Sequence, residues 1–248
     1  MTKLRMWSSI KDIKKVKRAS RSYRSVKLGQ LFELEWAHVY KETIRGKKWL
    51  EDLGISPGRW AGNYSLFYIL IRILSDFKPK KILEFGLGES SKLISSFLEN
   101  ELENSTQLII EQSSEWIENF NSRFSLSART RILHLPLAEK IIKRHKNYSY
   151  REIEKNINEA FDLYIIDGPT GSYRYSRHDI CILSERFRAE DDFIVIIDDS
   201  NRLGEIDTAK DLVSGLNKKG IKTYSGRYSG NKSQIVIATE KYKYAISL

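Results

Sequence analysis

Cysteine and long apolar runs are what this sequence most clearly lacks. Cys181 is the single cysteine among 248 residues, which excludes an intramolecular disulfide and a cysteine-rich zinc site and suits a reducing compartment. The longest apolar stretch, at 64–74, contains Arg72 and is too short to cross a bilayer. The N-terminus lacks the apolar core and cleavage site of a signal peptide. We therefore expect a cytoplasmic protein.

Acidic side chains are almost missing from the first thirty residues. Residues 1–30 carry ten Lys/Arg and one acid, Asp12, whereas the remainder carries 32 basic and 31 acidic residues. Nearly all of the net charge of +10 thus belongs to an N-terminal extension at 1–30, and the composition of the remainder does not predict a nucleic-acid partner. Apolar residues recur at every third position of the extension: Leu4, Trp7, Ile10, Ile13 and Val16.

This mixture is typical of a basic amphipathic helix, which suits an anionic membrane surface or an acidic partner. If the extension binds a membrane, we expect the protein to be attached to the inner face of that membrane. A solvated tail is the alternative to binding either a membrane or an acidic partner. The next segment, 31–62, predicts a helical cap or linker that ends at the breaker GISPG (54–58). Its aromatic residues are expected to cover part of the domain that follows.

Strands and helices alternate from residue 63 to the end, which defines the main domain at 63–248. Continuous apolar strands are predicted at 80–86, 107–112, 131–135, 161–167 and 192–198. Helical sequence is expected after each of them, including a stretch from 136 to about 160. Two segments, IKTYSG and SQIVIATE, close the chain as a hairpin. The fold class is therefore α/β, a mostly parallel sheet with helices on both faces and an antiparallel C-terminal hairpin strand.

The carboxyl ends of the first two strands carry the features of a nucleoside site. Glu84, Gly86 and Gly88 follow one another in LEFGLGESS, and Glu111 ends the second strand, at a spacing that suits hydrogen bonds to ribose hydroxyls. Ser90 and Ser91 stand where a dinucleotide fingerprint would place its third glycine, and the loop has no phosphate-binding lysine. Taken singly, the glycines could be purely steric and Glu111 could be a neighbour of a helix cap.

These features together resemble the class I S-adenosylmethionine-dependent methyltransferases. The resemblance runs over about 63–240 through ILEFGLGES, LIIEQ, FDLYIIDGP and IVIIDDS, with the closing hairpin. It implies a Rossmann-like methyltransferase fold with a seven-stranded sheet, and S-adenosylmethionine as cofactor. The resemblance implies that Glu84, Gly86 and Gly88 surround the methionine end of the cofactor and that Glu111 holds its ribose. Ser90 and Gln112 are predicted cofactor-binding residues as well. The acidic residue that the family carries after the third strand is absent, since Leu137 and Ala138 stand there.

Three carboxylates follow the next two strands. Asp167 ends the fourth strand, and Asp198 and Asp199 end the fifth, so adjacent strands would bring three like charges together. Oxygen ligands suit Mg²⁺ or Mn²⁺, and four histidines in the chain make zinc a poor candidate. The arrangement is similar to the metal-dependent O-methyltransferases of the catechol and macrocin type. The alternative is that Asp199 caps a helix and Asp167 is a turn residue.

The loop GPTGSYRYSRHD (168–179) is expected to face the acceptor. The catechol-type family has a lysine three residues after its first metal aspartate, but Thr170 stands at that position. His178 is then the candidate general base, with a surface histidine as the alternative. Arg174 and Arg177 are candidates to hold a phosphate or carboxylate of the substrate. The predicted catalytic set is His178, Asp167, Arg174 and Arg177.

The sequence thus predicts an enzyme that methylates a hydroxyl group of a sugar, glycan or small molecule, assisted by Mg²⁺ or Mn²⁺. No NPPY or DPPY motif follows the fourth strand, which argues against methylation of base amines. Two alternatives stay open. One is a metal-independent methyltransferase that acts on RNA or protein, and the other is a non-catalytic assembly subunit with the same fold. The sequence does not indicate an oligomeric state.

Overall fold

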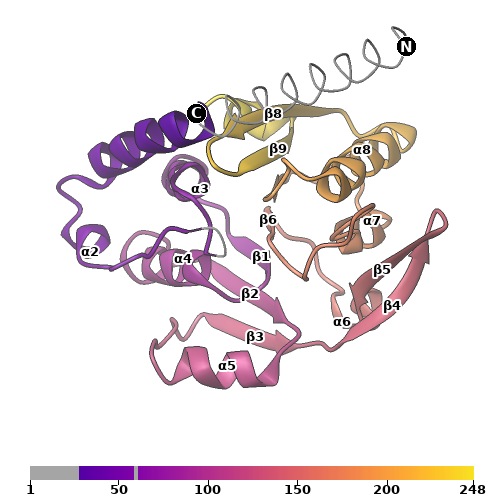
Figure 1. Cartoon of the computed structure of the whole chain (residues 1–248), viewed down its shortest axis with the longest axis horizontal. Helices are drawn as coiled ribbons and strands as arrows, with labels where there is room; N and C mark the ends of the chain where they lie inside the picture. Colours follow the sequence, from indigo (N-terminus) through magenta and orange to yellow (C-terminus); the bar gives the residue numbers. More distant parts are fainter. Residues whose placement is uncertain (1–27, 59–60) are drawn as a thin grey trace, which may run out of the picture.

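The structure is a computed structural model, and it describes residues 28–58 and 61–248 (Figure 1). The predicted amphipathic pattern at Leu4–Val16 therefore lies outside the described residues. A helix occupies 28–44 and is followed by the short helix α2 (Lys48–Glu51). Both pack on the main domain, since Tyr40 and Leu50 are buried in the same core as helix α3 (Tyr64–Phe77). The predicted boundary at residue 62 stays a prediction.

A seven-stranded sheet forms the centre of the molecule, in the order β3-β2-β1-β6-β7-β9-β8. Five strands are parallel, and β9 runs antiparallel between β7 and β8. The bounds are β1 (Lys81–Phe85), β2 (Thr106–Glu111), β3 (Thr130–His134), β6 (Leu163–Ile166), β7 (Ile194–Ile197), β8 (Thr223–Ser229) and β9 (Ser233–Thr239). The predicted α/β class, with its closing antiparallel hairpin, is confirmed.

Helices cover both faces of this sheet, which explains why its central strands are apolar throughout (Figure 1). On one face, α3 packs with α4 (Glu89–Asn100). On the other, α7 (Asp179–Ser184) and α8 (Leu203–Lys218) pack over β6 and β7, whose eight residues are all buried. Helix α5 (Ser114–Asn121) lies beside β2 and β3, and the 3-10 segment η1 (Glu240–Ile246) closes the chain.

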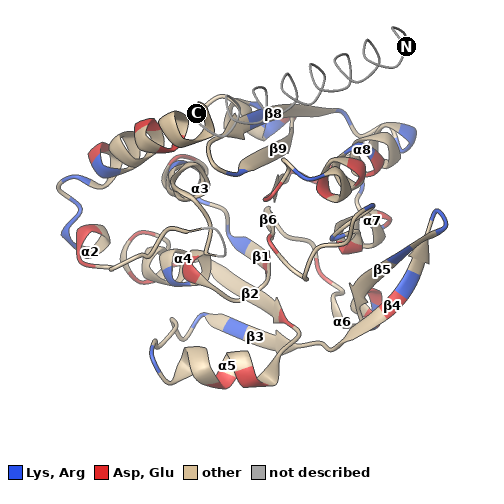
Figure 2. Ribbon diagram, in the orientation of Figure 1, with Lys and Arg blue, Asp and Glu red and all other residues tan. Residues whose placement is uncertain are grey.

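The stretch from 136 to about 160 is not the predicted helix. It forms an antiparallel hairpin of β4 (Leu137–Ile142) and β5 (His145–Tyr150), followed only by the single turn α6 (Ile153–Asn156). Lys143 and Arg144 form the two-residue turn, both with positive φ (46° and 71°), as tight hairpin turns require. Figure 2 shows this hairpin beside α6 and α7, with basic residues along it. The prediction failed because lysine and arginine carry no turn signal.

The helix at 28–44 is fastened to the β8–β9 turn by two side chains. Glu33 accepts hydrogen bonds from Asn63 Nδ2, Tyr64 N and Asn231 N, each at 2.8 Å. Trp36 donates through Nε1 to the carbonyl oxygen of Ser229 at 3.0 Å. A segment at the beginning of the chain thus fixes a turn near its end.

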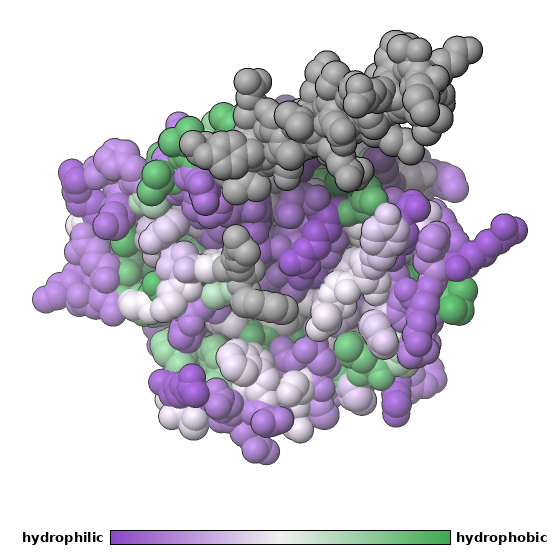
Figure 3. All heavy atoms as spheres, viewed as in Figure 1, coloured by the Kyte–Doolittle hydropathy of each residue, from purple (hydrophilic) through white to green (hydrophobic). Residues whose placement is uncertain are grey.

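None of the helices in the described part of the chain has the length and apolar character needed to cross a membrane. On the face shown in Figure 3, hydrophilic residues prevail and the hydrophobic ones form separate small areas.

Candidate active site

A cavity of about 470 Å³ opens at the carboxyl ends of β1, β2, β6 and β7. This edge includes the point between β1 and β6 where the strand order reverses, which is where open α/β sheets bind ligands. The residues that line one half of the cavity come from the loops after β1 and β2: Gly86, Leu87, Gly88, Glu89, Ser90, Glu111, Gln112 and Trp116. The residues of the other half come from later loops: Asp167, Gly168, Pro169, Thr170, Gly171, Arg177, Asp199, Arg202 and Lys232.

The two glycines after β1 have different roles. Gly86 has a φ of +95°, a conformation that strongly favours glycine, and its N–H donates to the carbonyl oxygen of Ile110 at 2.8 Å. Gly88 is extended, with a φ of −168°, and a Cβ atom placed on it would meet nothing within 4 Å. Gly86 is therefore needed for the turn, whereas Gly88 leaves open space on the cavity wall.

Glu84 lies beneath this wall and is not among the residues that line the cavity. Its carboxylate is fully buried and accepts hydrogen bonds from Ser90 Oγ, from Ser91 Oγ at 2.9 Å and from Gln107 Nε2 at 2.7 Å. Burial raises the pKa of Glu84 to about 7, although these hydrogen bonds oppose the shift. Glu84 thus holds the first turn of α4 in place and does not face the cavity.

Glu111 shapes the second wall. Its carboxylate is buried and accepts from three backbone N–H groups, those of Leu87 at 3.0 Å, Gln112 at 2.8 Å and Ser113 at 2.9 Å. These bonds join the loops after β1 and β2. Both Glu111 and Gln112 line the cavity, as the prediction of a cofactor site requires.

Trp116 is a wall residue that the sequence analysis missed. Its Nε1 donates to the carbonyl oxygen of Leu87 at 2.7 Å, and its side chain lines the same half of the cavity as Glu111. The signal was available in the sequence, because Ser113 is a helix N-cap whose Oγ accepts from Trp116 N at 3.1 Å. An N-cap directly after a strand places the first helical turn, and its aromatic residue, at the ligand edge of the sheet.

The three predicted carboxylates do come together. Asp167 follows β6, Asp198 and Asp199 follow β7, and one oxygen atom of each lies within 4.8 Å of the others. Asp198 is fully buried and Asp199 nearly so. Asp199 has a positive φ of 57°, which turns the chain sharply after the strand.

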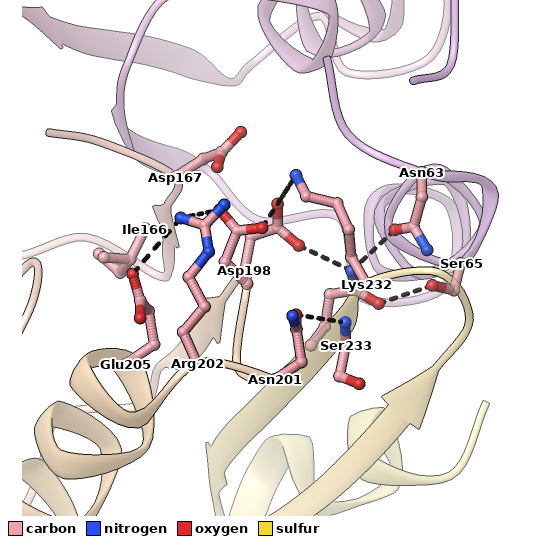
Figure 4. Close-up of polar contacts among 12 residues, drawn as sticks. Asn63, Ser65, Ile166, Asp167, Asp198, Asn201, Arg202, Glu205, Lys232 and Ser233 are labelled. Atoms are coloured by element: carbon pink, nitrogen blue, oxygen red, sulfur yellow. Dashed lines mark hydrogen bonds and ion pairs between the residues drawn. The ribbon is translucent and has the colours of Figure 1, made fainter. Parts of the chain in front are cut away.

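Two buried cations face these carboxylates. Lys232 Nζ lies 2.6 Å from Asp198 Oδ2 (Figure 4). It also lies 3.2 Å from Asp199 Oδ1. The guanidinium group of Arg177 lies 3.2 Å from Asp167 Oδ1 through NH1 and 2.9 Å from Asp199 Oδ2 through NH2. Every one of the three carboxylates is therefore paired with a side-chain cation.

Further polar groups complete this cluster. Gln234 Nε2 donates to Asp198 Oδ1 at 2.7 Å and to Asn63 Oδ1 at 2.8 Å. Arg202 lies 3.1 Å from Asp199 Oδ2, and the buried Glu205 on α8 lies 3.8 Å from Arg177 Nε. Figure 4 shows Arg202 and Glu205 on the α8 side and Lys232 on the side of the β8–β9 turn.

The pKa values follow from burial and from these partners. Burial, strengthened by the charge of Asp198, raises the pKa of Asp167 to about 8. Burial acts in the same direction on Asp198, but Lys232 and Gln234 outweigh it and lower the pKa of that carboxyl group. Burial alone would lower the pKa of Lys232, yet Asp198, Asp167 and Asp199 raise it. Asp198 therefore stays ionised beside Lys232, whereas Asp167 holds a proton more tightly than a free aspartate does.

The donor set suits Mg²⁺ or Mn²⁺ in its chemistry, but the side chains do not fit such an ion as they stand. Two like unit charges 4 Å apart repel by about 4 kcal/mol at an effective dielectric constant of 20, and a doubly charged ion doubles that repulsion. An ion among the three carboxylates would be close to both Lys232 and Arg177, which already contact those oxygen atoms. Binding a metal ion would require the displacement of at least one of them.

The structure separates the other predicted catalytic residues. His178 Nε2 lies 3.2 Å from Asp211 on α8, and Arg174 pairs with Asp207 of the same helix. Neither residue lines the cavity. Burial lowers the pKa of His178 despite the neighbouring carboxylate. Arg177, by contrast, is buried in the acidic cluster, so the structure brings Asp167 and Arg177 together and leaves His178 and Arg174 outside.

Comparison with known proteins identifies solved structures that have this fold. No family model matches the sequence, and no curated protein matches it. Among solved structures, a candidate caffeoyl-CoA O-methyltransferase from Staphylococcus aureus aligns over 84% of this chain and 100% of its own, with a TM-score of 0.50 and 14% identity. The cofactor-bound protein Rv0187 from MTB aligns over 82% and 94%, with a TM-score of 0.50 and 12% identity. The chain therefore has the Rossmann-like fold of the class I S-adenosylmethionine-dependent methyltransferases.

Proposed function

We propose that this protein is an S-adenosylmethionine-dependent O-methyltransferase. The observation that carries the proposal is a single cavity with two unlike halves. One half is walled by the loops after β1 and β2, including Gly88, Glu111 and Trp116, and the other by Asp167, Arg177 and Lys232. A cofactor and an acceptor bound in these halves would meet above the β1–β6 boundary.

The chemistry of the residues in the first half of the cavity suits the cofactor. When bound, S-adenosylmethionine supplies a methyl group on a positively charged sulfur. Gly88 leaves backbone exposed on the wall, and the first turn of α4 offers N–H groups to a carboxylate. Glu111 fixes both loops, Gln112 presents a polar side chain, and Trp116 offers an indole face to an aromatic base.

The second half of the cavity carries the groups that an acceptor hydroxyl needs. The hydroxyl proton must leave as the oxygen attacks the methyl group. Asp167 lines the cavity, and its raised pKa makes its ionised form a stronger proton acceptor than a free aspartate. Arg177 holds Asp167 through Oδ1 and Asp199 through Oδ2, so it orients both carboxylates. Because Arg177 is buried among them, its role is positioning rather than contact with a substrate phosphate.

A sugar or glycan hydroxyl is our proposed acceptor, with a small-molecule hydroxyl as the other candidate. Polar groups on the second half of the cavity, among them Thr170 and Arg202, support a polyhydroxylated acceptor. Activity on RNA or protein and a purely non-catalytic role have no observation in their favour in the described residues. Binding of the basic extension, 1–30, to an anionic membrane surface or an acidic partner stays part of the proposal, as does a cytoplasmic location.

Assistance by Mg²⁺ or Mn²⁺ stays a prediction from the sequence. The three carboxylates support it, whereas the ion pairs of Lys232 and Arg177 argue against it. No step of the proposed chemistry therefore runs through a metal ion.

The cofactor site can be tested by filling the open space at Gly88. Gly88→Leu places a side chain on the cavity wall, where a Cβ atom would meet nothing within 4 Å. Gly215→Leu on α8 is the matched control, since its Cβ also meets nothing within 4 Å and Gly215 does not line the cavity. Calorimetry should show that S-adenosylmethionine binds to wild type and to the control, and at least about tenfold more weakly to Gly88→Leu.

Equal affinity in all three proteins would place the cofactor elsewhere, and no binding to wild type would reject the proposed function. Transfer of radiolabelled methyl groups to a cell-surface glycan fraction, compared with its protein and RNA fractions, then identifies the acceptor class.

A further inference from the structure

We infer that the acidic cluster at this site is a receptor for the side chains of Lys232 and Arg177 and not for a divalent metal ion. The predicted metal site and the observed ion pairs involve the same three carboxylates, Asp167, Asp198 and Asp199. The inference does not rest on the proposed activity, because metal binding can be measured without an acceptor.

A metal ion would need the carboxylate oxygen atoms of the buried Asp198 as ligands, and these atoms already have partners. Its Oδ2 pairs with Lys232 Nζ at 2.6 Å, and its Oδ1 accepts from Gln234 Nε2 at 2.7 Å. Both oxygen atoms of this carboxylate thus already face a donor. Lys232 Nζ also reaches Asp199 Oδ1 at 3.2 Å, so the ammonium group bridges the two carboxylates that the metal ion would have to share.

Backbone hydrogen bonds of the β8–β9 turn hold Lys232 in this position. The carbonyl oxygen of Lys232 accepts from Gly230 N at 2.7 Å, and that of Ser233 accepts from Ser200 N at 2.7 Å. The preceding residue, Asn231, donates its N–H to Glu33 at 2.8 Å. The side chain of Lys232 is only 7% exposed, so its ammonium group contacts the carboxylates instead of water. A flexible lysine on the surface would stay hydrated.

Arg177 closes the opposite side of the cluster, and its side chain is 5% exposed. Its guanidinium group joins Asp167 to Asp199, and its NH1 donates to the carbonyl oxygens of Ile166 at 3.4 Å and Asp198 at 3.3 Å. Contacts to two strand ends make Arg177 part of the packed interior. A metal ion could not displace it without opening the ends of β6 and β7.

The test is a titration of the full-length protein with Mn²⁺ alone, followed by electron paramagnetic resonance of the free ion, with and without S-adenosylmethionine. Wild type should bind no Mn²⁺ at concentrations below about 1 mM. Lys232→Met removes the ammonium group and keeps the apolar stem, and it should bind Mn²⁺ at least about tenfold more tightly than wild type. Adding Asp198→Asn to this variant should abolish the gain.

Lys222→Met is the control, because Lys222 is an exposed lysine that pairs with Glu240 away from the cluster, and it should behave as wild type. Binding of one Mn²⁺ by wild type with a Kd below about 0.1 mM, lost in Asp198→Asn, would overturn the inference. The wild-type measurement decides the question even if Lys232→Met fails to fold. Calorimetry with S-adenosylmethionine on the same wild-type sample tests the proposed function separately.

Discussion

The burial of the Glu84 carboxyl group predicts how the free energy of unfolding depends on pH. It is fully buried, and in residues 28–58 and 61–248 no cation lies within ion-pair distance of it, so only Ser90, Ser91 and Gln107 compensate its charge. The pKa of Glu84 rises from 4.5 to about 7. The folded protein therefore binds this proton more tightly than the unfolded chain does.

The sign and size of the effect follow from that shift. Between pH 4.5 and 7 the unfolded chain has lost the proton of Glu84 while the folded protein retains it, so rising pH favours unfolding. A shift from 4.5 to about 7 at 1.36 kcal/mol per pKa unit lowers the free energy of unfolding by about 3 kcal/mol across this window. The contribution of Glu84 is fully present below pH 4.5 and is lost above pH 7.

Glu84→Gln removes the titration and keeps the shape. Urea unfolding at a series of pH values should show that the variant gains about 3 kcal/mol relative to wild type between pH 4.5 and 8. Glu118→Gln, at an exposed position of α5, is the control for the loss of a carboxyl group away from the core. A difference between Glu84→Gln and wild type that stays flat or shrinks as the pH rises would refute the account of Glu84.

Two further predictions concern the site and the extension. Asp167→Asn should lower methyl transfer to the acceptor fraction by at least about a hundredfold, while calorimetry finds S-adenosylmethionine affinity within about threefold of wild type; retained turnover would exclude Asp167 as proton acceptor. A chain lacking residues 1–27 should lose sedimentation with anionic vesicles and keep its melting temperature, and wild-type binding should fall as salt rises; equal vesicle binding by both chains would reject the targeting role.

The sequence predicted the sheet well, because strands buried on both faces must be apolar throughout, and IVIID and LYIID have that pattern. It predicted the meeting of Asp167, Asp198 and Asp199 for a related reason, since parallel neighbours end at the same edge. It could not predict Lys232 as their partner. That lysine sits in the turn of the predicted C-terminal hairpin, 34 residues after Asp198, and its pairing depends on how β9 inserts between β7 and β8.

The prediction of His178 as the general base failed for a different reason. A histidine near a ligand loop suggests a base from sequence position alone, but α8 brings Asp211 to it and draws it away from the cavity. The hairpin β4–β5 was missed because local propensity favoured a helix, whereas the fold uses Asn147 on β5 to hold the loop that follows β6. Asn147 Nδ2 donates to the carbonyl oxygens of Arg174 and Tyr175 at 2.6 and 2.7 Å.

The hydrogen bonds of Glu33 have a consequence for any surface that holds the basic extension. Glu33 lies five residues after Leu28 in the same helix, a rise of about 7.5 Å, and Glu33 is bonded to the turn that carries Lys232. A surface or acidic protein that pulled on Leu28 would therefore act on the β8–β9 turn through a short helical segment. Through Lys232 and its pair with Asp198, that pull would reach the wall of the cavity.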